Sequence, residues 1–97
     1  MTIKEQLYYL LEKYHDGEYD TKTFADQFDY IYAHGSDEAN FIQEEHELFY
    51  GVFRIVGRHS PFKDDHEKYP GVYYTDEDVR KIAEDVFWKT RKFRKNN

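Results

Sequence analysis

The sequence SPFKDDHEKYPGVYYTDED, residues 60–78, decides how the chain is divided. It contains both prolines, two groups of neighbouring acids and three of the ten tyrosines, and its apolar residues show no helical period. Three segments with helical patterning precede it and one follows. A compact domain rarely keeps so long a connection without a use for it. We therefore expect an all-α chain that is interrupted once by a long acidic, aromatic loop.

Four segments repeat apolar residues at steps of three and four, which is the spacing of one face of a helix. Their expected ranges are 3–15, 21–34, 38–57 and 76–93. Short connections between the first three segments favour antiparallel neighbours. The spacing therefore predicts an antiparallel four-helix bundle that forms a single domain, residues 1–97, with the long loop between the third and fourth helices.

Residues typical of helix ends agree with these ranges. Thr2 and Glu5 have the spacing of a capping box, and Thr75 precedes a first turn that contains three acids. Gly17 fits the left-handed position that often follows the C-terminus of a helix. The expected helix boundaries at these positions therefore rest on capping residues as well as on the spacing of apolar residues.

The third segment is apolar over so wide an arc that we expect it to be the central helix. We place His46 on its apolar face, as a core or boundary histidine. Gly51 costs roughly 1 kcal/mol there against alanine, and we attribute it to the close approach of a neighbouring helix. Three acids on the remaining surface form a second candidate docking face: Glu44, Glu45 and Glu47.

Length and cysteine content limit the possible classes of protein. A chain of 97 residues forms one core and no wide cleft between lobes. It has no cysteine, so it needs no oxidising compartment to fold and has no thiolate ligand for a metal. No apolar run is long enough for a membrane or signal segment. We expect a cytoplasmic protein that does not associate with a membrane.

Charge is distributed unevenly along the chain. Residues 1–88 contain all 20 acids against 9 basic residues, a balance of −11, and residues 89–97, KTRKFRKNN, add +5. An acidic body repels nucleic-acid phosphates and attracts cationic partners by long-range steering. We therefore expect a basic protein as partner and no nucleic acid.

Acids and histidines near the loop could in principle hold a metal ion or catalyse acid/base chemistry. The set His59, Asp64, Asp65, His66 and Glu67 has the spacing of neither an EF-hand loop nor a zinc-binding H-E-x-x-H helix. No serine or cysteine nucleophile lies in a recognisable turn, and no glycine-rich phosphate cradle is present. We expect a non-enzyme without cofactor or metal, and keep a metal-dependent hydrolase as an alternative.

Acids and aromatic residues are interleaved through the loop and the start of the last helix. Tyrosine offers a large contact area at low entropic cost, and grouped carboxylates offer sites for arginine or lysine. This combination suits a surface that recognises a basic partner, although the same tyrosines could simply pack over the bundle. The candidate binding residues are Asp64, Asp65, Glu67, Tyr69, Tyr73, Tyr74, Asp76 and Glu77.

The order of motifs resembles the colicin D type of bacteriocin immunity proteins, the self-protective colicin-like immunity family. The similar features are EHELFYGVF leading into RHSPFKDD, followed by YPGVYYTDEDVRKIAEDV as the last helix. The likeness extends over about residues 7–86. The family's acidic residues would fall near Ser60, Asp64 and Asp65, and Ser60 is not acidic here.

This resemblance implies a four-helix bundle that binds the nuclease domain of a toxin made by the same cell. In that family the toxin cuts tRNA anticodon loops, and the immunity protein covers its active site with carboxylates in place of RNA phosphates. We therefore expect an immunity protein or antitoxin, monomeric when free, that neutralises a basic toxin nuclease. The alternative is a small acidic helical regulatory or scaffolding protein that binds a basic peptide or oligomerises, without a toxin.

Overall fold

The computed structural model describes residues 1–94, and this part of the chain is all-α, as expected. Its only β-type pairing is an isolated parallel bridge between His59 and Tyr74. The helices, in chain order, are α1 (Ile3–His15), α2 (Thr21–Gly35), the short 3-10 helix η1 (Ser36–Glu38), α3 (Gln43–Val56), α4 (Lys63–Lys68), α5 (Asp76–Lys89) and α6 (Arg91–Arg94).

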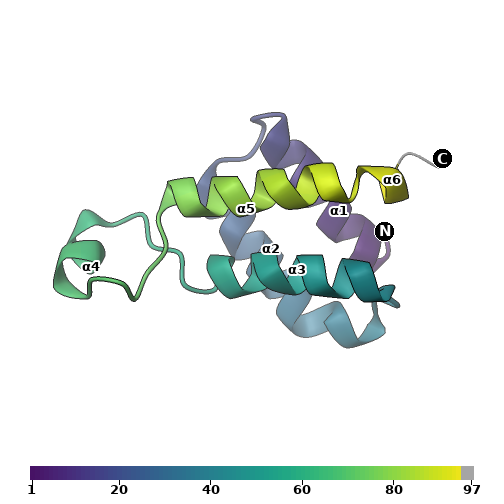
Figure 1. The fold of residues 1–97 in the computed structure, drawn as a ribbon, viewed down its shortest axis with the longest axis horizontal. Coiled ribbons are helices and arrows are strands. Elements are labelled where there is room, and N and C mark those ends of the chain that lie inside the picture. Colours follow the sequence, from purple (N-terminus) through teal and green to yellow (C-terminus); the bar gives the residue numbers. More distant parts are fainter. Residues whose placement is uncertain (95–97) are drawn as a thin grey trace.

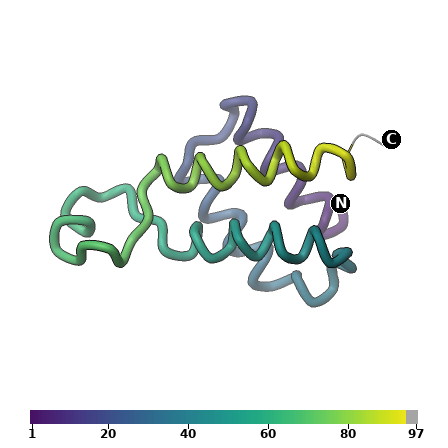
Figure 2. Tube along the Cα trace, viewed as in Figure 1, coloured from purple at the N-terminus to yellow at the C-terminus, as the bar shows by residue number. Residues whose placement is uncertain are grey.

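The four long helices pack as two pairs (Figures 1 and 2). α3 and α5 lie side by side and run in opposite directions, while α1 and α2 form a second pair that crosses behind them. α2 contacts both α3 and α5, and α1 contacts α5. None of the helices in residues 1–94 is long and apolar enough to cross a membrane.

The core is built largely from aromatic rings contributed by different helices. Tyr14 of α1 stacks on Phe24 of α2, with ring centroids 4.4 Å apart. Phe28 of α2 lies 6.1 Å from Phe49 of α3, measured between ring centroids. α5 completes this core with Val79, Ala83 and Val86. These packed rings hold the two pairs of helices against each other.

Three of the expected helix ends are confirmed, and each of them lies at a local motif. Thr2 and Glu5 form the capping box of α1. Thr75 caps α5, because its hydroxyl accepts a hydrogen bond from the Asp78 N–H. Gly17 follows α1 with φ of +80°, the left-handed conformation expected of it.

The third helix begins later than expected, at Gln43 rather than at residue 38. Asn40 has φ of +54°, which interrupts the helical path between η1 and α3. This change of direction lets Phe41 pack against Phe49, with ring centroids 5.2 Å apart. The Glu45 side chain accepts a hydrogen bond from the Ile42 N–H. This N–H, at the start of the helix, would otherwise have no backbone partner.

Two interpretations of α3 are wrong. His46 is exposed rather than packed on the apolar face, and its ring lies 6.5 Å from that of Tyr50. Gly51 has no neighbour within 4 Å of the position that a Cβ would occupy, so no helix approaches it closely. The close approach occurs instead at Gly35, where an added Cβ would lie 2.5 Å from Cδ1 of Ile3.

The last helix is shorter than the expected range 76–93. α5 ends at Lys89, and α6 continues as a separate short helix. Thr90 lies between them with its side chain buried, and its hydroxyl donates a hydrogen bond of 2.7 Å to the carbonyl oxygen of Val86. Threonine that bonds back to the preceding turn in this way commonly bends or ends a helix.

Candidate interaction surface

Residues 60–75, here called the projecting segment, extend beyond the ends of α3 and α5 (Figure 1). α4 lies in the middle of this segment, where we expected an irregular loop. A helix of six residues is too short to show an apolar period. The helical signal that remains is a pair of opposite charges four residues apart, because Nζ of Lys63 lies 3.6 Å from Oε1 of Glu67.

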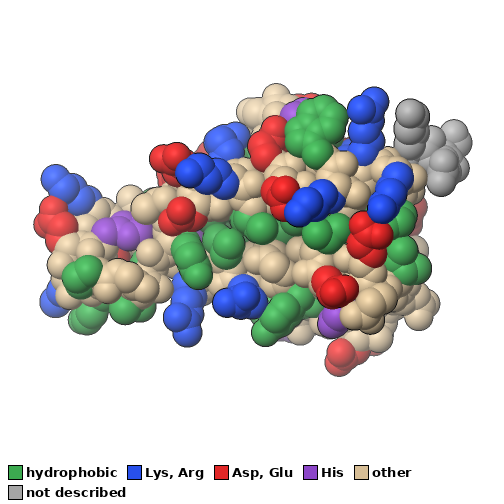
Figure 3. Space-filling model, in the orientation of Figure 1, with side chains coloured by type: hydrophobic (Ala, Val, Ile, Leu, Met, Phe, Trp, Pro, Cys, Tyr) green, Lys and Arg blue, Asp and Glu red, His purple; other side chains and the backbone are tan. Residues whose placement is uncertain are grey.

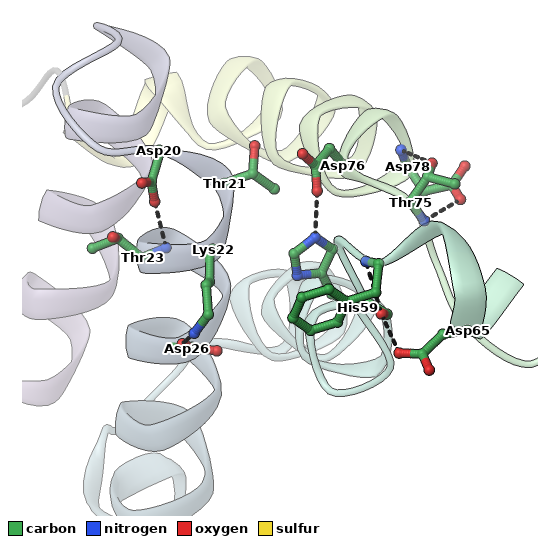
Figure 4. Close-up of polar contacts among 12 residues, drawn as sticks. Asp20, Thr21, Lys22, Thr23, Asp26, His59, Asp65, Thr75, Asp76 and Asp78 are labelled. Carbon is green, nitrogen blue, oxygen red and sulfur yellow. Dashed lines mark hydrogen bonds and ion pairs between the residues drawn. The ribbon is translucent and has the colours of Figure 1, made fainter.

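The two ends of the projecting segment are joined at its base. The Ser60 N–H donates to the Tyr74 carbonyl at 3.0 Å, and the Tyr74 N–H donates to the Arg58 carbonyl at 2.7 Å. Beside these bonds, Nε2 of the buried His59 side chain lies 2.6 Å from Oδ1 of Asp76 (Figure 4). The segment is therefore attached to the helices on both sides by backbone and side-chain bonds.

A second set of hydrogen bonds orders the inside of the segment around Ser60, which is buried. The Ser60 hydroxyl donates to Oδ2 of Asp65 at 2.5 Å and accepts from the Phe62 N–H at 3.2 Å. Nε2 of His66 donates to the Ser60 carbonyl oxygen at 2.8 Å. Asp65 is thus half-buried and bonded within the segment, so it is not a free surface charge.

The outer side of the segment presents acids and aromatic rings to solvent. Asp64 is exposed and forms no ion pair within residues 1–94, whereas Glu67 is exposed and pairs with Lys63. Tyr69 and Tyr73 are 48% and 36% exposed and meet edge to face, with ring centroids 6.3 Å apart. The two tyrosines therefore form one exposed aromatic pair on the same segment as Asp64 and Glu67.

A tight turn places these two tyrosines next to each other. The Val72 N–H donates to the Tyr69 carbonyl at 3.1 Å, with Pro70 and Gly71 between them. Gly71 has φ of +81°, and proline followed by glycine is typical of a type II turn. Glycine at this position allows the chain to reverse without strain.

The remaining predicted residues of the loop and α5 have structural partners. Tyr74 is half-buried, and its backbone forms the base described above. Asp76 is bonded to His59, and Glu77 is exposed and lies 3.4 Å from Lys81. These three residues lie at the edge of the exposed surface, and each of them is bonded to another residue of the protein.

Two exposed apolar residues were not among the predicted binding residues. Phe62 is 62% exposed and Val72 is 45% exposed, and both belong to the projecting segment. Figure 3 shows acidic, basic, histidine and hydrophobic side chains together at this end of the molecule. The segment contains three acids and two lysines, so its surface is only weakly acidic. Contact with a partner here would depend on apolar and aromatic area as well as on charge.

The second predicted acidic face does not exist as one surface. Glu45 is buried, whereas Glu47 is exposed and Glu44 lies 2.9 Å from Lys92. The position of Glu45 could have been inferred from its spacing, because it lies four residues before Phe49 on the stripe that faces the core.

Glu45 instead connects α1 to the start of α3. Its carboxylate lies 2.8 Å from the Lys4 ammonium, accepts from the Tyr8 hydroxyl at 2.5 Å and accepts from the Ile42 N–H at 3.1 Å. Burial raises the pKa of Glu45, but the hydrogen bonds from Lys4, Tyr8 and Ile42 outweigh it, so the pKa lies below its ordinary value of 4.5. Burial and the bond to Glu45 raise the pKa of Tyr8.

The residues considered for a metal site are not assembled as one. Within residues 1–94, no group of three or more His, Asp or Glu side chains could hold a metal ion. His59 bonds to Asp76, and Asp65 and His66 both bond to Ser60. These three side chains are therefore bonded to separate partner atoms and are not grouped around one point.

Known proteins offer no further guide. No family model, curated protein or solved structure matches the chain. The resemblance to the colicin D type of immunity proteins remains a prediction from the sequence.

Proposed function

We propose that this protein is an immunity protein or antitoxin that binds a basic toxin nuclease through the projecting segment. One observation supports this proposal above the others: an ordered segment stands out from the helices and exposes two aromatic rings together with an acid that has no ion-pair partner within residues 1–94. Asp64, Tyr69 and Tyr73 are the members of that set. Tyrosine is enriched in binding hot spots, and an exposed carboxylate can pair with arginine or lysine of a partner.

Order in the free protein favours binding. The bonds around Ser60 and the base at Tyr74 hold the segment in shape before a partner arrives. A surface that is already ordered loses less conformational entropy on association than a flexible loop does. In this proposal the segment inserts into the partner's nuclease site, where Asp64 and Glu67 meet cationic groups that would otherwise bind RNA phosphates.

The resemblance supplies the rest of the proposal. The long helices α1, α2, α3 and α5 correspond to the helices of a four-helix bundle that serves as a scaffold for the segment. The chain acts in the cytoplasm as a monomer, without catalytic activity, cofactor or direct contact with nucleic acid. A tRNA-cutting nuclease is the partner class that the resemblance implies.

A co-expression test addresses this proposal directly. A toxin nuclease encoded beside this protein is expressed with the wild type, with Asp64→Ala/Glu67→Ala, or with the control Asp37→Ala/Glu38→Ala. The control removes the same two charges from the exposed helix η1, away from the segment. We expect the first double variant to weaken binding by about 2–5 kcal/mol, as for charges desolvated on docking, and to lose protection.

Two results would contradict the proposal. One is full protection by Asp64→Ala/Glu67→Ala, which would remove the segment from the interface. The other is equal loss in both double variants, which would show that only total charge matters. Association rates of the wild type should also fall as salt rises, because exposed charges steer the encounter.

The exposed Phe62 and Val72 favour a second candidate, in which the same segment binds a basic peptide or a second copy of this chain in a regulatory or scaffolding role. Sedimentation of the purified protein over a range of concentrations separates these cases. A dimer that Phe62→Ser dissociates would favour self-association over toxin binding.

A further inference from the structure

A pocket of about 510 Å³ lies where the C-terminal half of α3 meets α2 and the base of the projecting segment. Its volume falls in the range that holds small ligands, about 300–1,000 Å³. The side chains that matter for its chemistry are Asp29, Tyr50, Phe53, Arg54, Arg58 and Tyr74. None of these belongs to the exposed set Asp64, Tyr69 and Tyr73 on which the proposed function rests.

Arg54 and Arg58 are the two lysine or arginine side chains in residues 1–94 that have neither an ion pair nor an aromatic ring beneath them. Eight others pair with acids, and they are Lys4, Lys13, Lys22, Lys63, Lys81, Lys89, Lys92 and Arg94. Lys68, Arg80 and Arg91 each lie over an aromatic ring. In a chain with 20 acids and 14 lysines and arginines, two neighbouring arginines without a partner are unexpected.

Arg54 lies in the last turn of α3, and Arg58 follows two residues after that helix ends; both are exposed and line the same pocket. Two like charges that line one pocket disfavour each other, and an anion bound between them would reduce that repulsion. The guanidinium group fits phosphate with paired hydrogen bonds. The negative end of the α3 dipole accounts for a cation near this terminus, but not for two arginines lining one pocket.

The other pocket residues indicate that the ligand is more than a bare anion. Tyr50 is 49% exposed, and its ring lies 6.4 Å from that of Phe53, so aromatic surface is open to a planar group. Asp29 is half-buried and pairs with neither arginine, which leaves its carboxylate to accept hydrogen bonds from a ligand. A carboxylate repels phosphate, so it suits a ligand end that carries amino or hydroxyl donors.

We propose that this pocket binds a small phosphorylated molecule that carries a planar ring, with a mononucleotide as the simplest case. Arg54 and Arg58 hold the phosphate, Tyr50 stacks on the ring, and Asp29 accepts from an amino or hydroxyl group. Because Tyr74 and Arg58 also form the base of the projecting segment, a bound ligand would touch the residues from which that segment extends.

Titration of the full chain with AMP, GMP, CMP and UMP tests the proposal by calorimetry and by NMR shifts. Adenosine, ribose 5-phosphate and inorganic phosphate serve as partial ligands. We expect at least one mononucleotide to bind, each partial ligand to bind more weakly, and Arg54→Gln/Arg58→Gln to weaken binding by at least about tenfold. The control Lys22→Gln/Lys89→Gln removes the same charge from exposed sites outside the pocket and should bind as the wild type does.

Several outcomes would overturn the proposal. They are no binding of any mononucleotide at millimolar concentration, equal binding by the double arginine variant, and inorganic phosphate binding as tightly as the best nucleotide. Thermal melting of each variant shows whether it is folded. Single substitutions, Arg54→Gln and Arg58→Gln, replace the double variant if that one unfolds. Toxin protection is measured separately, so failure here leaves the proposed function standing.

Discussion

The Ser60 hydroxyl donates a hydrogen bond of 2.5 Å to Oδ2 of Asp65, which assigns different roles to two adjacent acids. Asp65 turns inward and orders the projecting segment, while its neighbour Asp64 remains exposed. A double substitution of both acids would mix these effects. Single substitutions separate the shape of the segment from its charge.

Replacing Asp65 with alanine should loosen the projecting segment without unfolding the helices. The change leaves the buried Ser60 hydroxyl without its acceptor, a loss of about 1–2 kcal/mol that falls on the segment. Hydrogen exchange of the amides in residues 60–75 should become faster. Asp64→Ala serves as the control and should leave exchange unchanged. Equal exchange in both variants would show that the Asp65 bond does not order the segment.

Replacing Glu45 with alanine should destabilise the whole protein. It removes the partner of Lys4, Tyr8 and the Ile42 N–H at once, and we expect a loss of about 2–4 kcal/mol in the free energy of unfolding. Urea denaturation measures this loss. Glu47→Ala removes an exposed acid from the same helix and should change stability by less than about 0.5 kcal/mol. A similar loss in both variants would contradict the role assigned to Glu45.

Lowering the pH should reduce the stability of the protein through the carboxylates of Glu45 and Asp78. The pKa of Glu45 in the folded protein lies below its ordinary value of 4.5, and the pKa of Asp78 lies below 3.8, mainly because of the Thr75 N–H. The unfolded chain then binds protons more readily, so this stability is present above pH 4.5 and is lost as the pH falls through the lowered values. Urea unfolding at a series of pH values should show the decline.

A matched variant assigns part of this pH dependence to Glu45. Glu45→Gln does not titrate at that position, so its stability should fall less steeply with acid than that of the wild type. Parallel curves for the two proteins would mean that other carboxylates account for the decline.

Two glycine substitutions should change stability in opposite directions. Gly51→Ala meets no atom within 4 Å and should stabilise α3 by up to about 1 kcal/mol, since alanine is the better helix former. Gly35→Ala would place a Cβ 2.5 Å from Cδ1 of Ile3 and 2.8 Å from its Cγ1. We expect that variant to lose about 1–3 kcal/mol through overpacking.

Melting temperature measures both glycine variants, because 1 kcal/mol corresponds to about 4–8 °C for a domain of this size. A lower melting temperature for Gly51→Ala would indicate a close contact at that glycine after all. An unchanged one for Gly35→Ala would mean that the Ile3 side chain moves aside at little cost.

Local signals in the sequence predicted much of the helical framework. The capping box at Thr2, the cap at Thr75 and the left-handed Gly17 each depend on residues within a few positions of one another. The sequence left open whether Tyr69 and Tyr73 pack over the bundle or face solvent, and the structure shows both of them exposed. By contrast, α4 was missed because one and a half turns contain too few residues for a period to appear.

The chain by itself therefore determined its helical class, most of its helix ends and the stretch that leaves the helical body. Tertiary structure alone decided which charges are free. Glu45 is buried because Lys4 and Tyr8, distant in sequence, meet it across the packed helices, and His59 reaches Asp76 only because the ends of the segment close together. Within residues 1–94, Arg54 and Arg58 line a pocket together with Asp29 but form no ion pair with it or with any other acid. Such pairings follow from contacts between distant residues, which no local pattern encodes.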